Sequence, residues 1–192
     1  MPEPTDFARD WYIVVRGVID LARADDLHSY TLGVADRETI ANDSQVPGSQ
    51  VAYGLARMDE LLEDVRGRVE SATGLNLWPT YSYCRVYRRG SRLEPHTDRP
   101  SCEISMSVNL GRSSDEPWPL FVVGPQGTAA VELNPGDGLI YRGIDCYHWR
   151  EALRGEYATQ VFLHYVDRDG PHAEWKFDKR SGLTTRPPRD RG

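Results

Sequence analysis

Cysteine is scarce in this sequence, and its few copies stand far apart. Cys84, Cys102 and Cys146 form an odd set without a Cys-x-x-Cys pair, so their spacing indicates neither a disulfide framework nor a zinc site. This pattern fits a reducing compartment. Residues 1–6 lack the basic and apolar regions of a secretory signal, so we expect a cytoplasmic protein.

Long apolar runs and an excess of basic residues are also missing. No run approaches the roughly eighteen apolar residues of a membrane span, so no membrane partner is expected. Lys and Arg number 23 against 29 Asp and Glu, which gives a formal net charge of −6. Nucleic-acid surfaces need clustered Lys and Arg to neutralise phosphates, so no nucleic-acid partner is expected either.

The length and composition are those of one soluble globular domain, which we expect to span residues 1–192. The hydrophobic fraction of 39% is enough to bury a sizeable core. Residues 1–76 predict an N-terminal strand and supporting helices, with residues 34–50 as a loop. The strand is expected near 11–15 and the helices over 20–32 and 55–69, the second ending at Gly74. Expected core contacts of the first helix are Leu21, Leu27 and Tyr30.

Between residues 77 and 166 the sequence consists of short β-rich runs separated by turns. Many short strands of this kind predict a mainly β sandwich or barrel with flanking helices. The expected strands are 80–88, 103–110, 119–123, 129–133, 138–141 and 159–166. Residues 167–192 form a polar extension, in which Trp175 and Phe177 are expected to hold a last extended segment and the end to be mobile.

A His-x-Asp pair follows the first of these strands. Side chains alternate faces along an extended chain, so His96 and Asp98 point the same way. A second imidazole would complete a 2-His-1-carboxylate site, which holds Fe(II) and leaves positions open. His148 is the first candidate for it, with His164 and His172 as alternatives. Because a lone His-x-Asp is common, the alternative to a metal site is a hydrogen-bonded surface pair.

The residues around this pair resemble the motif of the Fe(II)- and 2-oxoglutarate-dependent oxygenases, and within them the prolyl-hydroxylase-like group. The matching positions, in order, are Tyr87, Gly90, Glu94-Pro95-His96-Thr97-Asp98, Gly136-Asp137 and His148. The resemblance covers residues 77–166 and implies a double-stranded β-helix, a cupin-like jelly-roll with His96, Asp98 and His148 as ligands of Fe(II). It also implies 2-oxoglutarate and O2 as co-substrates, with succinate and CO2 released as a C–H bond is hydroxylated.

The distal carboxylate of 2-oxoglutarate needs a cationic or strongly donating partner. The resemblance implies a Lys or Arg where this chain has residues 157–158, which are Tyr and Ala, so another residue must bind it. Arg150 is the first choice, because it lies two residues after His148 and shares its face in an extended strand. The alternative for Arg150 is a surface salt bridge.

Three more residues are candidates for contact with the co-substrate. Arg154 and Gln160 are the second choices for the distal carboxylate. Tyr87 stands at the position of a co-substrate-binding tyrosine in the family, and its alternative is a packed core aromatic.

Together these features predict an Fe(II)/2-oxoglutarate-dependent dioxygenase that hydroxylates a small molecule or an amino-acid-like substrate. The small size of the chain favours a small substrate over a polypeptide. A protein hydroxylase of the prolyl type is one alternative, and it requires an extended groove beside the metal. A non-catalytic, cupin-like metal- or ligand-binding protein is the other.

Overall fold

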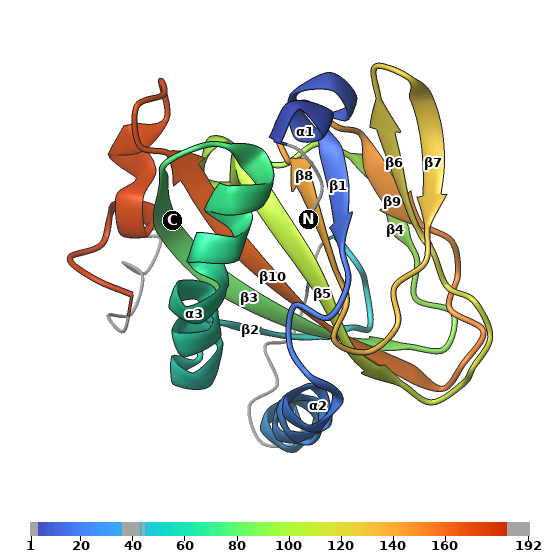
Figure 1. Ribbon diagram of the computed structural model, residues 1–192. Coiled ribbons are helices and arrows are strands. Elements are labelled where there is room, and N and C mark those ends of the chain that lie inside the picture. Colours follow the sequence, from blue (N-terminus) through green and yellow to red (C-terminus); the bar gives the residue numbers. More distant parts are fainter. Residues whose placement is uncertain (1–3, 36–42, 44, 184–192) are drawn as a thin grey trace.

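Two antiparallel β-sheets form the body of the protein (Figure 1). The computed structural model describes residues 4–35, 43 and 45–183. The strand order is β1-β8-β5-β10-β3-β2 in the larger sheet and β4-β9-β6-β7 in the smaller. The strands are β1 (Tyr12–Val15), β2 (Gln50–Tyr53), β3 (Leu77–Arg88), β4 (Leu93–His96), β5 (Ile104–Arg112), β6 (Leu120–Gly124), β7 (Gly127–Val131), β8 (Gly138–Arg142), β9 (His148–Arg150) and β10 (Tyr157–Asp167). This is the double-stranded β-helix, so the predicted fold class is confirmed.

Helices cover one face of the larger sheet (Figure 1). They are α1 (Pro4–Asp10), α2 (Leu21–Ala35) and α3 (Ala56–Thr73), and short 3-10 segments are η1 (Pro100–Cys102) and η2 (Ala173–Lys179). The apolar face of α3 packs into the main core through Leu61, Leu62 and Val65. Gly74 ends α3 in the left-handed region at φ 76°, where glycine has no Cβ penalty, as the sequence predicts.

Side chains along the central strands point alternately into this core and into the interior between the two sheets. On β10, Val161, Leu163 and Tyr165 belong to the core under the helices. Phe162 and His164 alternate with them and therefore point to the other face, toward the smaller sheet. The interior between the sheets consequently receives the polar and aromatic side chains of β3 and β10.

The expected helices and most of the expected strands have counterparts in the structure, and several points differ. The N-terminal strand is β1, which pairs with β8 at the edge of the larger sheet. The prediction for Leu21 is wrong, because this side chain is 70% exposed at the start of α2. Strand β2 and helix α1 were not expected from the sequence. Residues 36–42 and 44 of the expected loop, and 184–192 of the expected mobile end, lie outside the described residues.

The predicted extended segment around Trp175 and Phe177 is also wrong. The chain forms the 3-10 segment η2 there, and Phe177 and Asp178 adopt positive φ angles of 53° and 55°. Asp178 accepts hydrogen bonds from Tyr53 and Arg99 at 2.5 and 2.8 Å, and these contacts hold the segment against the larger sheet. Long-range hydrogen bonds thus override the local alternation of apolar and charged residues.

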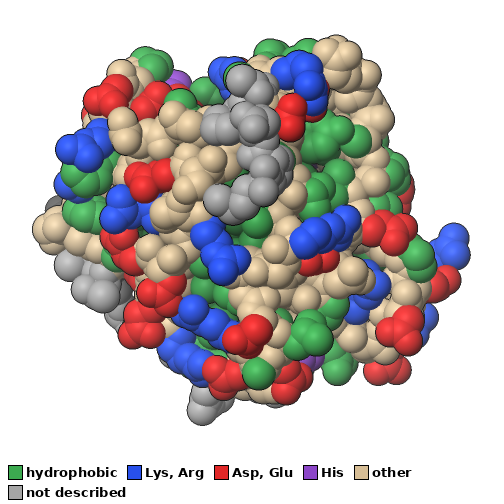
Figure 2. Space-filling model, viewed as in Figure 1, with side chains coloured by type: hydrophobic (Ala, Val, Ile, Leu, Met, Phe, Trp, Pro, Cys, Tyr) green, Lys and Arg blue, Asp and Glu red, His purple; other side chains and the backbone are tan. Residues whose placement is uncertain are grey.

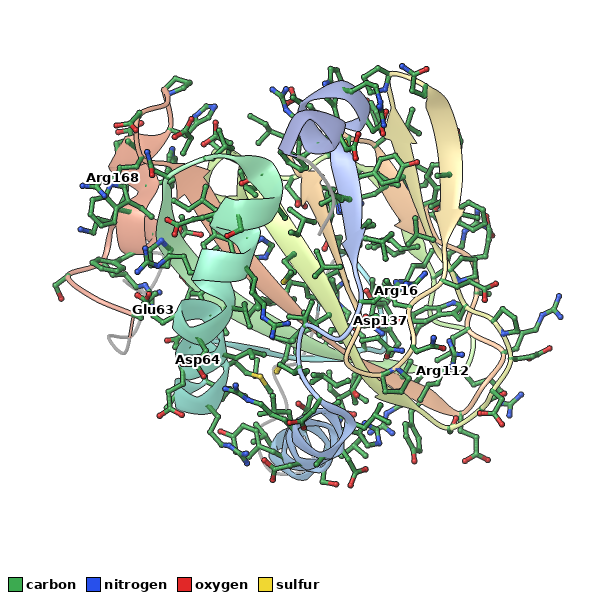
Figure 3. All side chains as sticks on the ribbon, viewed as in Figure 1. Arg16, Glu63, Asp64, Arg112, Asp137 and Arg168 are labelled. Atoms are coloured by element: carbon green, nitrogen blue, oxygen red, sulfur yellow. The ribbon has the colours of Figure 1, made fainter. Side chains whose placement is uncertain are left out.

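Asp137, in the turn before β8, ties the N-terminal segment to the sheet. Its carboxylate accepts hydrogen bonds from the backbone N–H groups of Gly17 and Asn134, both at 3.0 Å. Arg16 lies 2.7 Å from it, and Figure 3 shows the two side chains together. Burial raises the pKa of Asp137, but these hydrogen bonds and Arg16 outweigh it, so the net pKa is lowered. Asp137 is therefore a structural anchor.

The surface mixes charges of both signs. Figure 2 shows acidic and basic side chains interspersed on the face that it presents. None of the helices in the described ranges is long and apolar enough to cross a membrane. The cytoplasmic location stays a prediction.

Candidate metal centre

His96, Asp98 and His148 meet beside the smaller sheet. His96 on β4 and His148 on β9 are register partners, and Asp98 follows β4. The Nε2 atoms of both histidines lie 3.6 Å from Oδ1 of Asp98, and the two ring centroids are 4.2 Å apart. The three ligand atoms all lie within 4.8 Å of one another, so one ion can contact them together. The structure thus assembles the three residues that the sequence predicts as metal ligands.

The backbone orients both imidazoles. Nδ1 of His96 donates to the carbonyl of Glu94 at 2.8 Å, and Nδ1 of His148 donates to the carbonyl of Cys146 at 3.0 Å. In the neutral form of each ring, Nε2 is then the unprotonated nitrogen that a metal needs, the usual arrangement of ligating histidines. A register shift lies between Leu93 and His96, and Pro95 falls within it, where its missing N–H costs no ladder bond. Two imidazoles and one carboxylate fit Fe(II).

Gly143 makes room for Asp98. The backbone N–H of Asp98 donates to the carbonyl of Gly143 at 2.8 Å. A Cβ at position 143 would lie 2.1 Å from the carbonyl oxygen of Cys102 and 2.6 Å from Oδ2 of Asp98. The sequence analysis missed Gly143, because this close approach depends on chain segments that meet only in the fold.

Burial and neighbouring charges shift the pKa values of the three predicted ligands. Burial raises the pKa of Asp98, but its bond with His96 and the nearby histidines outweigh burial, so the net pKa is lowered. Burial lowers the pKa of His148 and keeps its ring neutral. For His96, burial also lowers the pKa, but the hydrogen bonds to Asp98 and the Glu94 carbonyl dominate, and the net pKa is raised. A metal ion therefore meets an ionised carboxylate and a neutral His148, and at His96 it competes with a proton whose binding is favoured by the raised pKa.

The alternative histidines occupy other positions. His164 is buried, and its Nδ1 atom lies 2.9 Å from Oγ of Ser105. It could join a second ligand group with Asp98 and Cys102. Burial raises the pKa of the Cys102 thiol to about 12, however, so this sulfur is protonated and a poor ligand. His172 belongs to neither group in the described part of the chain.

Arg150 is fully buried and lacks an acidic partner. Its side chain shares the inner face of β9 with His148, while Trp149 between them points outward. Nη1 donates to the carbonyl of Trp118 at 2.8 Å, and the Nε atom has no partner. No carboxylate of the described residues lies within ion-pair distance of it. Burial lowers the pKa of Arg150 to about 10. A buried, unmatched cation is expensive and indicates a site for an anion.

A chain of amides holds Arg150 in place. Nη2 of Arg150 donates to Oε1 of Gln160 at 3.3 Å, and Nε2 of Gln160 donates to Oδ1 of Asn109 at 3.0 Å. Asn109 in turn donates to the carbonyl of Leu133 at 2.8 Å. The ring of Trp118 lies 4.5 Å from the guanidinium and covers it. The structure therefore brings Gln160 to Arg150, and Trp118 is a neighbour that the sequence did not reveal.

Tyr87 lies in the same interior and contacts a second arginine. Its side chain is fully buried, and its hydroxyl accepts a hydrogen bond from Nη1 of Arg85 at 3.0 Å. Arg85 is buried as well, but Asp43 neutralises it at 2.7 Å. This ion pair spans the sheet and the loop before β2. Arg85 is thus paired within the protein, in contrast to Arg150.

Arg154 does not fit the interior group. Its side chain is 83% exposed and forms an ion pair with Glu116 at 3.3 Å. It lines a surface groove, whereas the metal residues line a different cavity, and Arg150 and Gln160 line a separate small space in the interior. The second-choice prediction for Arg154 as a partner of the distal carboxylate is therefore not supported by its position.

The metal residues open into a cavity of about 290 Å³. This volume lies at the small end of ligand sites, which typically span roughly 300–1,000 Å³. Besides the three predicted ligands, side chains of β3 and β10 line it, among them Tyr81, Tyr83 and Phe162. The described residues therefore leave room for a small ligand beside the metal residues.

No protein-family model matches the chain, and no curated protein is similar to it in sequence. Solved structures, in contrast, are similar over most of the chain. The epimerase SnoN in complex with Fe3+, alpha ketoglutarate and nogalamycin RO superposes with a TM-score of 0.74 at 16% identity, covering 97% of this chain and 91% of that chain. A prolyl-4-hydroxylase from Pseudomonas putida gives 0.69 at 15% identity, covering 87% and 97%.

HygX from Streptomyces hygroscopicus, with nickel and 2-oxoglutarate bound, gives a TM-score of 0.66 at 12% identity, covering 86% of each chain. At these identities the similarity shows a shared fold. The structural neighbours are Fe/2-oxoglutarate-dependent oxygenases, so the fold is the one that the sequence resemblance implies.

Proposed function

We propose that this protein is an Fe(II)- and 2-oxoglutarate-dependent dioxygenase that hydroxylates a C–H bond of a small molecule. The observation that supports this most directly is the convergence of His96, Asp98 and His148 with both Nε2 atoms directed at Asp98. Structural neighbours that bind iron or nickel together with 2-oxoglutarate add support. The cavity volume of about 290 Å³ beside these residues favours a small substrate.

The three ligands would hold Fe(II), which with 2-oxoglutarate and O2 supplies the oxidising power for C–H cleavage. The protein supplies geometry. The two rings are fixed by donating from Nδ1 to the Glu94 and Cys146 carbonyls, and Oγ of Ser105 lies 3.1 Å from Oδ2 of Asp98. Such outer contacts keep ligating atoms in place while positions on the metal stay open.

Arg150 would bind the distal carboxylate of 2-oxoglutarate. Its charge has no internal counterion among the described residues, and its Nε atom is a buried donor without a partner. Ser107, on the inner face of β5, also has a buried hydroxyl without a partner. An incoming carboxylate would satisfy the charge of Arg150, and Gln160 and Trp118 would keep the guanidinium oriented. Tyr87, buried nearby, would line the co-substrate site.

The test is anaerobic reconstitution of the full chain with Fe(II) and 2-oxoglutarate. We expect a visible charge-transfer band on addition of 2-oxoglutarate, and succinate release on exposure to air. His96→Ala and Asp98→Ala should abolish both signals. Arg57→Ala is a matched control, because Arg57 lies on α3 in a surface ion pair with Asp26.

The outcomes of this experiment distinguish the proposed function from its two alternatives. A metal that binds without any band from 2-oxoglutarate would favour a cupin-like binding protein. Turnover stimulated by proline-containing peptides, but by no small molecule, would favour a prolyl-type protein hydroxylase. The prolyl-4-hydroxylase among the structural neighbours makes that second comparison necessary.

A further inference from the structure

Four rings form a continuous wall along one side of the cavity. Tyr83 faces Phe162, and Tyr81 faces His164, as register partners on β3 and β10. The centroids of Tyr81 and His164 are 4.5 Å apart, and those of Tyr83 and Phe162 are 6.1 Å apart. The planes of Phe162 and His164 differ by 11°, whereas the two cross-strand pairs are tilted by 39° and 41°. All four line the cavity that holds the metal residues. We call these four residues the aromatic wall.

The aromatic wall begins next to the metal ligands. His164 contacts Oγ of Ser105 at 2.9 Å, and the same oxygen lies 3.1 Å from Oδ2 of Asp98. The guanidinium groups of Arg85 and Arg99 lie over the rings of Tyr83, Phe162 and Tyr81. A molecule packed against the remaining surface of the wall is close to the metal side of the cavity. Aromatic side chains favour flat apolar or aromatic groups, which they contact by stacking or edge-to-face packing.

The cations of the cavity are already neutralised. Arg85 is paired with Asp43 at 2.7 Å. Arg99 is paired with Asp178 at 2.8 Å. In the loaded site, the two charges of Fe(II) and the charge of Arg150 would balance the Asp98 carboxylate and the two carboxylates of 2-oxoglutarate. Among the described residues, a charged substrate would therefore bury an ion without a counterion, which is costly.

His164 presents a hydrogen-bond acceptor on this wall. Oγ of Ser105 lies 3.1 Å from both Oδ2 of Asp98 and the carbonyl of Cys102, which accept only. When the single hydroxyl proton points to one of these oxygens, Nδ1 of His164, at 2.9 Å, is the donor to Ser105. Nε2 of His164 is then an acceptor on a ring that lines the cavity.

We infer that the substrate is an uncharged small molecule with a flat ring system and a hydroxyl or amine N–H donor, which lies on the aromatic wall. This inference rests on the proposed function for the role of the metal, but binding of the molecule can be measured without turnover. Its recognition groups are Phe162 and Tyr83 for the ring and His164 for the donor.

Three matched probes test it by anaerobic calorimetry on protein loaded with Fe(II) and 2-oxoglutarate. They are 2-naphthol, 2-naphthoate and 2-naphthylmethylamine, which share one ring system and differ in charge. We expect 2-naphthol to bind about tenfold or more tightly than either charged probe, the equivalent of about 1.4 kcal/mol. Phe162→Leu keeps an apolar side chain but removes the ring, and should weaken 2-naphthol binding about fivefold or more, in the range of an aromatic pair.

Phe121→Leu is the matched control, because Phe121 stacks on Trp149 on the outer side of β9 and lies outside the cavity. It should leave the affinity for 2-naphthol unchanged. Failure of 2-naphthol to bind, equal or tighter binding of a charged probe, or wild-type affinity in Phe162→Leu would overturn the inference. The visible band of 2-oxoglutarate is recorded in the same samples. Its absence with intact 2-naphthol binding would refute the proposed function and leave the inference standing.

Discussion

Arg150 hydrogen-bonds to Gln160 at 3.3 Å, and this amide is the group that faces a guanidinium with no carboxylate partner among the described residues. A neutral partner orients Arg150 without cancelling its charge. The charge stays available to an anion that enters the interior. The first two predictions follow from this pair.

Arg150→Met should raise the dissociation constant for 2-oxoglutarate by about a hundredfold, since a charge-assisted bidentate contact is lost. Removal of an unmatched buried cation should also leave the free energy of unfolding of the ligand-free protein unchanged or about 1 kcal/mol higher. Titration of the visible band and urea denaturation measure the two effects. Arg154→Met, at an 83% exposed side chain, should change neither. Equal losses of affinity for 2-oxoglutarate in both variants would show that Arg150 does not bind the co-substrate.

Gln160→Glu should inhibit co-substrate binding by giving Arg150 an internal counterion. The new carboxyl group would compete with 2-oxoglutarate for the same guanidinium, and we expect a rise of about tenfold or more in its KM. Gln160→Leu removes the hydrogen bonds without adding charge and should cause a smaller rise. Steady-state succinate assays distinguish the two variants. A larger defect in the leucine variant would contradict this account.

Gly143→Ala should weaken metal binding through Asp98. The added methyl group would collide with the Cys102 carbonyl and with Oδ2 of Asp98, so the carboxylate must shift. Displaced supporting groups typically cost about 10–100-fold in metal affinity. Competition with a chelator measures the affinity, and circular dichroism checks that the variant folds. Gly67→Ala is the matched control, because a Cβ there meets nothing within 4 Å. It should bind metal normally and raise stability by about 0.5–1 kcal/mol. Wild-type metal affinity in a folded Gly143→Ala protein would refute the steric argument.

Asp137→Asn should destabilise the protein at neutral pH but not in acid. The amide would set an NH2 group against a backbone N–H, so we expect a loss of about 1–3 kcal/mol. The folded pKa of Asp137 is lowered, so its contribution is complete above the unfolded value of about 3.9 and disappears as pH falls through the lower folded value.

Urea denaturation at neutral and strongly acidic pH compares the two proteins. The control is Asp64→Asn, a 54% exposed position on α3 (Figure 3), which should change stability by less than about 0.5 kcal/mol. A stability difference for Asp137→Asn that persists at the lowest pH would show that its charge is unimportant.

Short-range patterns explain why much of the centre could be predicted from the sequence. His96 and Asp98 converge as a spacing of two residues suggests, although β4 ends at His96 and the Gly143 carbonyl positions Asp98. The same alternation correctly placed Arg150 beside His148 on an inner face. The resemblance to a known motif supplied His148, which spacing alone left open against two other histidines.

Long-range contacts explain what could not be predicted. The pairing of Arg85 with Asp43 and the cover of Trp118 over Arg150 join segments with no shared periodicity. The space requirement at Gly143 is equally invisible in a linear chain. Around η2, the local alternation of apolar and charged residues suggested an extended segment. The hydrogen bonds that Asp178 accepts from distant residues stabilise a 3-10 conformation instead. These contacts depend on which surfaces meet after folding.

The predicted metal ligands come from β4 and β9 and the residues just after β4, whereas the aromatic wall comes from β3 and β10 in the other sheet. The proposed metal site and the proposed substrate-binding rings thus lie on different sheets. Substitutions in the aromatic wall can therefore be made without changing the predicted metal ligands. Positions 83 and 162 are natural starting points for directed evolution of the proposed enzyme toward new substrates.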